Sequence, residues 1–125
     1  MTLLLDTHVL LWWLGDDPRL PADVAALVGD GAEEVAVSAA TVWEIGIKRA
    51  LGKLQAPDDL LEEVERSGFT PWQITPRDAD AAGRLPRHHD DPFDRMLLAQ
   101  AQQRGAALAS VDRRFPAYGV RLLGQ

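Results

Sequence analysis

Four acidic residues occupy positions that could bring them to one metal site: Asp6, Glu44, Asp94 and Asp112. Asp6 directly follows the apolar run at residues 3–5, which is typical of a buried strand. Asp112 comes just after the run of small residues at 106–110, so it has the same position relative to its own expected strand. Open α/β sheets bind ligands at the carboxyl ends of their strands. Because neighbouring parallel strands lie about 4.8 Å apart, the two carboxylates could share a divalent cation if these strands pair.

The other two acids belong to expected helices. Glu44 lies near the buried face of its helix, where an unpaired carboxylate is costly, so it needs a cation. That cation could be Lys48, four residues later on the same helix. Asp94 falls near the third position of a helix that Asp91 caps, and the helix dipole stabilises any carboxylate there by roughly 0.3–1 kcal/mol. Asp91 is the natural cap and so the weaker candidate for a ligand. Asp94 is the better one, because Met96, Leu97, Leu98 and Ala101 are expected to hold its helix against the sheet.

Carboxylates that converge without cysteine are the ligands that Mg²⁺ and Mn²⁺ prefer. Without a metal, such close like charges would raise one another's pKa. Phosphodiester hydrolysis is the chemistry that such a site performs best. The pattern therefore predicts a metal-dependent hydrolase.

Plainer interpretations of the same residues stay open at this point. Asp6 could be a helix cap, and Asp112 could be a turn residue before two arginines. His88 and His89 could belong to a transition-metal cluster, but adjacent side chains diverge and no pair of histidines has helical i,i+4 spacing. We expect His8 to pack or cap near Asp6 and assign it no catalytic role.

The elements that must position these acids alternate along the chain. Strands are expected at residues 3–5, 34–37, 69–74, 106–110 and 120–123. Helices are expected at residues 8–14 with Thr7 as the cap, 21–29, 39–51 with Ser38 as the cap, 57–66, 76–85 with Thr75 as the cap, and 92–104. Pro71 confines the third strand to a sheet edge. This alternation predicts an α/β fold, with a mainly parallel sheet of four to five strands flanked by helices in a single domain over residues 1–125.

The composition narrows the class of protein. The 125 residues carry 13 Lys and Arg against 19 Asp and Glu, and the net charge of −6 argues against binding nucleic acid by bulk electrostatics. It does not argue against a metal nuclease, whose acidic cluster is neutralised by cations. No cysteine is present, no apolar run approaches the ~20 residues that span a bilayer, and no signal peptide is expected. We expect a cytoplasmic protein.

The motifs around the four acids resemble those of the PIN-domain nucleases, and in particular the VapC-type toxins of type II toxin–antitoxin systems. The resemblance rests on residues 3–8 (LLLDTH), 38–45 (SAATVWEI), 91–95 (DPFDR) and 110–112 (SVD). It implies a PIN fold and a Mg²⁺-dependent endoribonuclease in which Mn²⁺ can substitute. It also implies that Asp6 and Asp94 are the core metal ligands, and that Glu44 and Asp112 complete the site directly or through water.

The same resemblance implies partners: an RNA substrate, a second copy of the chain in a homodimer, and a cognate antitoxin whose tail enters the acidic groove. RNA phosphates would then meet local basic side chains, for which the candidates are Lys48, Arg49, Lys53, Arg95, Arg113 and Arg114.

Two other functions compete with this one. A phosphatase of the haloacid dehalogenase type also places an Asp after a hydrophobic strand, but it needs a second Asp two residues later, where this chain has His8. A non-catalytic α/β interaction module would use the acids only as structural caps and would bind no metal.

Overall fold

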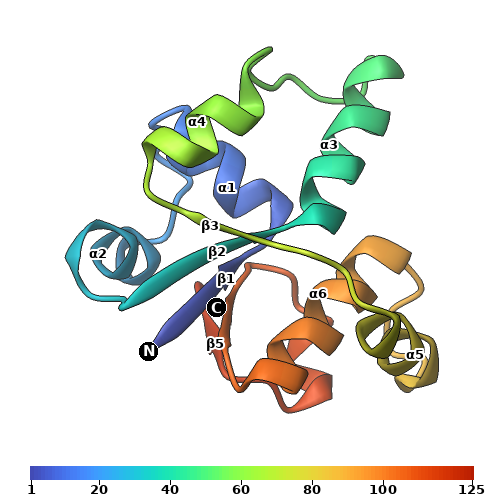
Figure 1. The fold of residues 1–125 in the computed structure, drawn as a ribbon. Coiled ribbons are helices and arrows are strands. Elements are labelled where there is room, and N and C mark those ends of the chain that lie inside the picture. The colour runs from blue at the N-terminus through green and yellow to red at the C-terminus, as the bar shows by residue number, and fades with distance from the viewer.

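A five-stranded parallel sheet forms the centre of the computed structural model, which describes all 125 residues. The strands are β1 (Thr2–Leu5), β2 (Glu34–Ser38), β3 (Thr70–Trp72), β4 (Ala107–Ala109) and β5 (Leu122–Leu123), in the spatial order β3-β2-β1-β4-β5. Every pair of neighbours is parallel, so the predicted sheet is confirmed. β1 occupies the middle and pairs with both β2 and β4. Figure 1 shows β1 beside β2.

Six α-helices and one short 3₁₀ helix cover the two faces of this sheet (Figure 1). They are α1 (Thr7–Leu14), α2 (Ala22–Asp30), α3 (Ala39–Ala50), α4 (Leu60–Arg66), α5 (Pro76–Arg84), α6 (Pro92–Arg104) and the 3₁₀ helix η1 (Phe115–Tyr118). The predicted helices are all present, although α4 starts three residues later and α2 runs one residue further than expected. Strands β3, β4 and β5 are shorter than their apolar runs.

The pleat of β1 divides the core into two layers. Leu3 and Leu5 face the layer built with α1 to α4, whereas Leu4 faces the layer built with α6 and η1. All three leucines are fully buried, and each such burial contributes about 1.5–3 kcal/mol. β2 follows the same rule, because Val35 and Val37 face the first layer as predicted. The strand that precedes Asp6 is therefore anchored on both faces.

Helix starts differ from the predictions at one position that matters for the site. Ser38 caps α3 and the Thr75–Asp78 capping box opens α5, both as predicted. The cap of α1, however, is Asp6 and not Thr7, since an Asp6 oxygen accepts the Val9 amide. An N-cap has extended backbone, which Asp6 takes directly from the end of β1.

The edge position predicted for the third strand is also confirmed. β3 pairs only with β2, with Pro71 opposite Val37. Proline lacks the amide that a second neighbouring strand would need, so it is tolerated there. None of the helices is long and apolar enough to cross a membrane.

Candidate active site

Asp6 lies where β1 passes into α1. Its backbone amide donates to the Ala109 carbonyl at 3.1 Å, which continues the β1–β4 ladder by one bond. Its side chain is buried, and Oδ1 accepts the Val9 amide at 2.9 Å. Burial raises the pKa of Asp6 above its ordinary value, although hydrogen bonds from the Ser110 hydroxyl and the Val9 amide oppose that change. Strand and helix together fix this carboxylate rigidly.

Asp112 follows β4, which pairs directly with β1 as the site requires. The Ser110 hydroxyl accepts the Asp112 amide at 3.0 Å and so shapes the turn after the strand. The Arg114 guanidinium binds both carboxylate oxygens of Asp112, at 3.1 and 2.9 Å. These hydrogen bonds lower the pKa of Asp112 to about 2, so it is ionised. Asp112 therefore lies in a turn before two arginines and also lines the same cleft as Asp6, so both interpretations of this residue hold.

Glu44 is buried on α3, one side of which contacts α1. The Thr7 hydroxyl donates to Oε1 and the Lys48 ammonium to Oε2, each at 2.5 Å. The predicted ion pair with Lys48 is therefore confirmed. The hydrogen bond to Glu44 raises the pKa of Lys48, so this lysine remains charged.

Asp94 is at the third position of α6, as predicted, and Asp91 is the cap. Asp91 Oδ1 accepts the amides of Phe93 and Asp94 at 2.8 and 3.0 Å. The pKa of Asp94 is raised to about 8. Burial is the main cause, followed by repulsion from Asp91, Glu44, Asp6 and Asp112. The other three predicted acids, Asp6, Glu44 and Asp112, therefore all lie close enough to Asp94 to affect its pKa.

The four acids line one cleft of about 250 Å³. All but one of the residues that line it are polar or charged: Asp6, Thr7, His8, Glu44, Lys48, Asp91, Asp94, Val111, Asp112 and Arg114. A larger cleft of about 390 Å³ lies beside β3, but its lining is mainly apolar and contains no acid. The polar cleft is therefore the place for the predicted chemistry.

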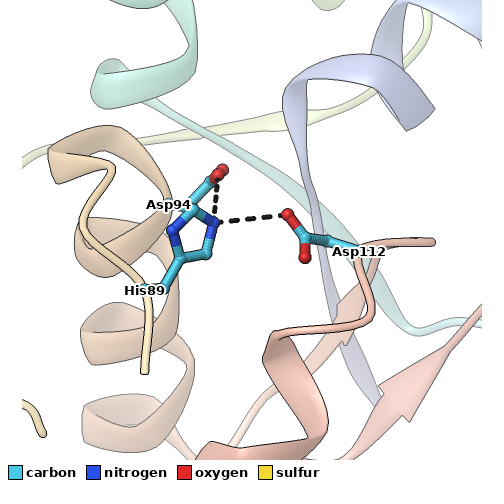
Figure 2. A group of neighbouring side chains, drawn as sticks. All are labelled: His89, Asp94 and Asp112. Atoms are coloured by element: carbon cyan, nitrogen blue, oxygen red, sulfur yellow. Dashed lines mark hydrogen bonds and ion pairs between the residues drawn. The ribbon is translucent and has the colours of Figure 1, made fainter. Parts of the chain in front are cut away.

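His89 also belongs to this site, although no role is predicted for it from the sequence. Its ring is buried, and Nε2 lies 2.8 Å from Asp94 Oδ2 and 3.2 Å from Asp112 Oδ2 (Figure 2). The neighbouring His88 is exposed, with its ring 5.2 Å from that of Tyr118. The two side chains diverge as predicted, but this divergence sends one of them into the site. The sequence offers one indication of this contact: His89 lies two residues before Asp91, which caps the helix that carries Asp94.

The basic residues around the cleft are mostly engaged within the protein. Arg95 donates to the backbone carbonyls of Ala82, Leu85, Pro86 and His89, so the expectation that it contacts RNA is not supported by its position. Lys48 and Arg114 neutralise Glu44 and Asp112 at the wall of the cleft. Arg49 donates to a backbone carbonyl, that of Pro57. The remaining two candidates, Lys53 and Arg113, are exposed.

The donor set fits a hard divalent cation. Glu44 and Asp112 have basic partners, whereas Asp6 and Asp94 form no ion pair with Lys or Arg. Burial raises the pKa of both unpartnered acids, which means that the protein alone stabilises their charges poorly. A divalent cation bound by carboxylate oxygens would stabilise them, and oxygen ligands suit Mg²⁺ and Mn²⁺.

Comparisons with known proteins agree with this geometry. Residues 3–120 match the PIN domain family. The chain is 34% identical over 121 residues to Ribonuclease VapC22 of Mycobacterium tuberculosis, which covers 90% of this chain and 88% of that protein.

Solved structures of toxin–antitoxin complexes share the fold. VapBC from Salmonella typhimurium, bound to DNA, superposes with a TM-score of 0.73 at 20% identity, over 98% of this chain and 97% of that one. A toxin–antitoxin complex from Klebsiella pneumoniae superposes with a TM-score of 0.70 at 18% identity, over the same shares. The fold, the family match and the identity to a curated relative together confirm the resemblance that the motifs predicted: the chain belongs to the PIN-domain family and, within it, to the VapC type.

Proposed function

We propose that this protein is a Mg²⁺-dependent endoribonuclease and the toxin of a toxin–antitoxin pair. The observation that carries the proposal is the pairing pattern in the cleft. Two carboxylates, the buried Asp6 and the half-buried Asp94, face a common cleft without any Lys or Arg partner. Asp6 also caps α1, but the amide that it accepts carries no full positive charge, and neither acid has a Lys or Arg that would neutralise it. A bound cation would neutralise both.

The roles of the four acids follow from their partners. Asp6 and Asp94 would be the core ligands, while Glu44 and Asp112 would complete the site directly or through water. Thr7 and Lys48 orient Glu44, and Arg114 orients Asp112. The bound Mg²⁺, or Mn²⁺ in its place, supplies the Lewis acidity that phosphodiester hydrolysis requires. Lys48 and Arg114 stand at the cleft, where their positive charge can bind RNA phosphates.

The partners belong to the same proposal. The relative at 34% identity is named a ribonuclease, and the structural neighbours are toxin–antitoxin complexes. We therefore propose an RNA substrate, a cognate antitoxin, a homodimer and a cytoplasmic location for this chain. An acidic chain with an acidic cleft suits a basic antitoxin segment.

The test is RNA cleavage in Mg²⁺ by the wild type and by Asp6→Asn and Asp94→Asn. Both variants should lose cleavage, and both should lose the rise in Tm that Mn²⁺ causes in the wild type. Asp90→Asn is the matched control, because Asp90 is exposed and pairs only with Arg87. Undiminished cleavage by both site variants would overturn the assigned site. A wild type that binds no Mn²⁺ would instead support the non-catalytic module.

A further inference from the structure

We propose that His89 is a positioning residue of the metal site, which holds Asp112 by a hydrogen bond, lies against Asp94 and does not itself bind the metal. The inference rests on the proposed function, because it concerns the ligands of that site. Its physical basis is the place of His89 Nε2 between the two carboxylates, within hydrogen-bond distance of one oxygen from each (Figure 2).

The hydrogen bond on the other side of the ring decides what Nε2 does. His89 Nδ1 lies 3.2 Å from the Asp91 amide nitrogen, which can only donate. Nδ1 must therefore be the acceptor, and a neutral ring then carries its hydrogen on Nε2. That hydrogen is available to Asp112, which accepts it, and Asp94 Oδ2 lies 2.8 Å from the same nitrogen. The backbone at the cap of α6 thus fixes the tautomer that the carboxylates need.

The same bond argues against His89 as a ligand. Nε2 and one oxygen each from Asp94 and Asp112 lie within 4.8 Å of one another, close enough for one cation. Binding through Nε2 would require its lone pair, so a neutral ring would carry its hydrogen on Nδ1 instead. That hydrogen would then face the Asp91 amide hydrogen, and the hydrogen bond from the Asp91 amide to Nδ1 would be lost. The donor role keeps every hydrogen bond that the structure shows.

The ring is held firmly enough to act in this way. It packs 5.8 Å from the ring of Phe115, which is itself fully buried. The His89 carbonyl accepts a hydrogen bond from Arg95 at 3.2 Å. The same guanidinium binds the carbonyls at the end of α5, so the segment between α5 and α6 is tied at both ends. A rigid donor can set the direction of two carboxylates that come from different elements.

The position of the hydrogen can be tested without metal. The ¹⁵N chemical shifts of the His89 ring in the metal-free protein should show a protonated Nε2 and an unprotonated Nδ1. A ring with its hydrogen on Nδ1 would overturn the proposal, whether or not the protein cleaves RNA.

The positioning role is tested by Mn²⁺ titration of His89→Leu and His89→Gln. Leu removes the donor, and we expect Mn²⁺ binding roughly 10–100-fold weaker, as for other groups that orient metal ligands. Gln offers an amide hydrogen at a similar reach and should restore most of the affinity. His88→Gln, at the exposed neighbour, is the matched control and should bind as the wild type does.

Three outcomes contradict the proposal: unchanged Mn²⁺ affinity in His89→Leu, equal losses in the Leu and Gln variants, or a directly coordinated nitrogen in pulsed electron paramagnetic resonance of the Mn²⁺-loaded wild type. Failure of the proposed function would give a different experimental result from failure of the positioning role. A wild type that binds Mn²⁺ with the expected His89 dependence but cleaves no RNA would refute the ribonuclease and leave the positioning role intact.

Discussion

The Thr7 hydroxyl donates a hydrogen bond to Glu44 Oε1, so the first residue of α1 holds an acid on α3 that is 37 positions away. Both groups are buried. The bond explains why Thr7 is not the helix cap: its side chain turns into the cleft, and Asp6 caps α1 in its place. Two adjacent residues thus serve the site in different ways, one as a candidate ligand and the other as a support for a second ligand.

Replacing Thr7 with Val should destabilise the protein. Val keeps the shape of Thr but leaves Glu44 Oε1 without its donor, and an unsatisfied buried acceptor costs about 1–3 kcal/mol. Urea unfolding at pH 7 measures the loss in the free energy of unfolding. Thr7→Ser keeps the hydroxyl and is the control, with a loss expected to be well below that of Val. Equal stability of the Val variant and the wild type would contradict this role.

Replacing Lys48 with Met should make the protein depend more strongly on metal. Glu44 would lose the ammonium that neutralises it, so the metal-free variant should melt at a lower temperature. A nearby divalent cation would take over part of that role, because binding to the folded state stabilises it. Mn²⁺ should therefore raise the Tm of Lys48→Met by more than it raises that of the wild type. Lys53→Met, at an exposed lysine, is the control, and equal Mn²⁺ shifts in both variants would contradict the coupling.

The sequence predicts the fold well because its signals are local. The apolar runs at β1 and β2, the caps Ser38 and Asp91, and the proline in β3 each fix an element through the backbone nearby. The pairing of β1 with β4, which the sequence left as a condition, is given by the structure. The boundaries that differ, such as the late start of α4, depend on packing, which no local pattern contains.

The candidate site is predictable only in part, for the same reason. Strand ends and helix position point to the acids, and Lys48 is four residues from its partner Glu44. His89 lies only five residues before Asp94, but Asp112 lies 23 residues further along the chain than His89, so no local pattern shows that these side chains meet. The hydrogen bonds from Arg95 to backbone carbonyls could not be predicted from the sequence either, because every residue has a carbonyl and no residue type marks the ones that accept. These relationships come from tertiary structure alone.

Asp78 contributes to stability away from the cleft. It is buried at the start of α5, and the Arg104 guanidinium binds both of its oxygens, at 2.8 and 2.9 Å. These bonds, with further help from the Thr75 amide and Gln100, hold the pKa of Asp78 well below its ordinary value of 3.8. The carboxylate therefore stabilises the fold above about pH 4, and this contribution disappears as the pH falls toward the lower pKa of the folded state.

Asp78→Asn should accordingly lower the free energy of unfolding at pH 7 by about 2–4 kcal/mol, somewhat less than for a fully buried pair because Arg104 is partly exposed. The difference from the wild type should narrow as the pH falls below about 4. Urea unfolding at several pH values measures both effects. Asp80→Asn, at an exposed acid on the same helix, should change little. A constant difference at every pH would contradict the role of the carboxylate charge.

Asp94 should show the opposite dependence on pH. In the metal-free protein its pKa is raised to about 8 from 3.8, chiefly by burial and then by the neighbouring acids. Between these two values the folded protein keeps a proton that the unfolded chain has lost. The unfolded chain thus binds fewer protons, and the stability of the metal-free protein should fall as the pH rises from about 4 to 8.

Asp94→Asn carries no ionisable group at this position and should escape that loss. At pH 8 without metal the variant should be more stable than the wild type, by roughly 1–3 kcal/mol, and the difference should vanish near pH 4. Under the proposed function the same variant should gain nothing from Mn²⁺ and cleave no RNA, so the charge that weakens the fold is the one that binds the cation. Urea unfolding at pH 4 and pH 8, with Asp90→Asn as the exposed control, measures the effect. A variant no more stable than the wild type at pH 8 would show that Asp94 ionises in the folded protein without strain.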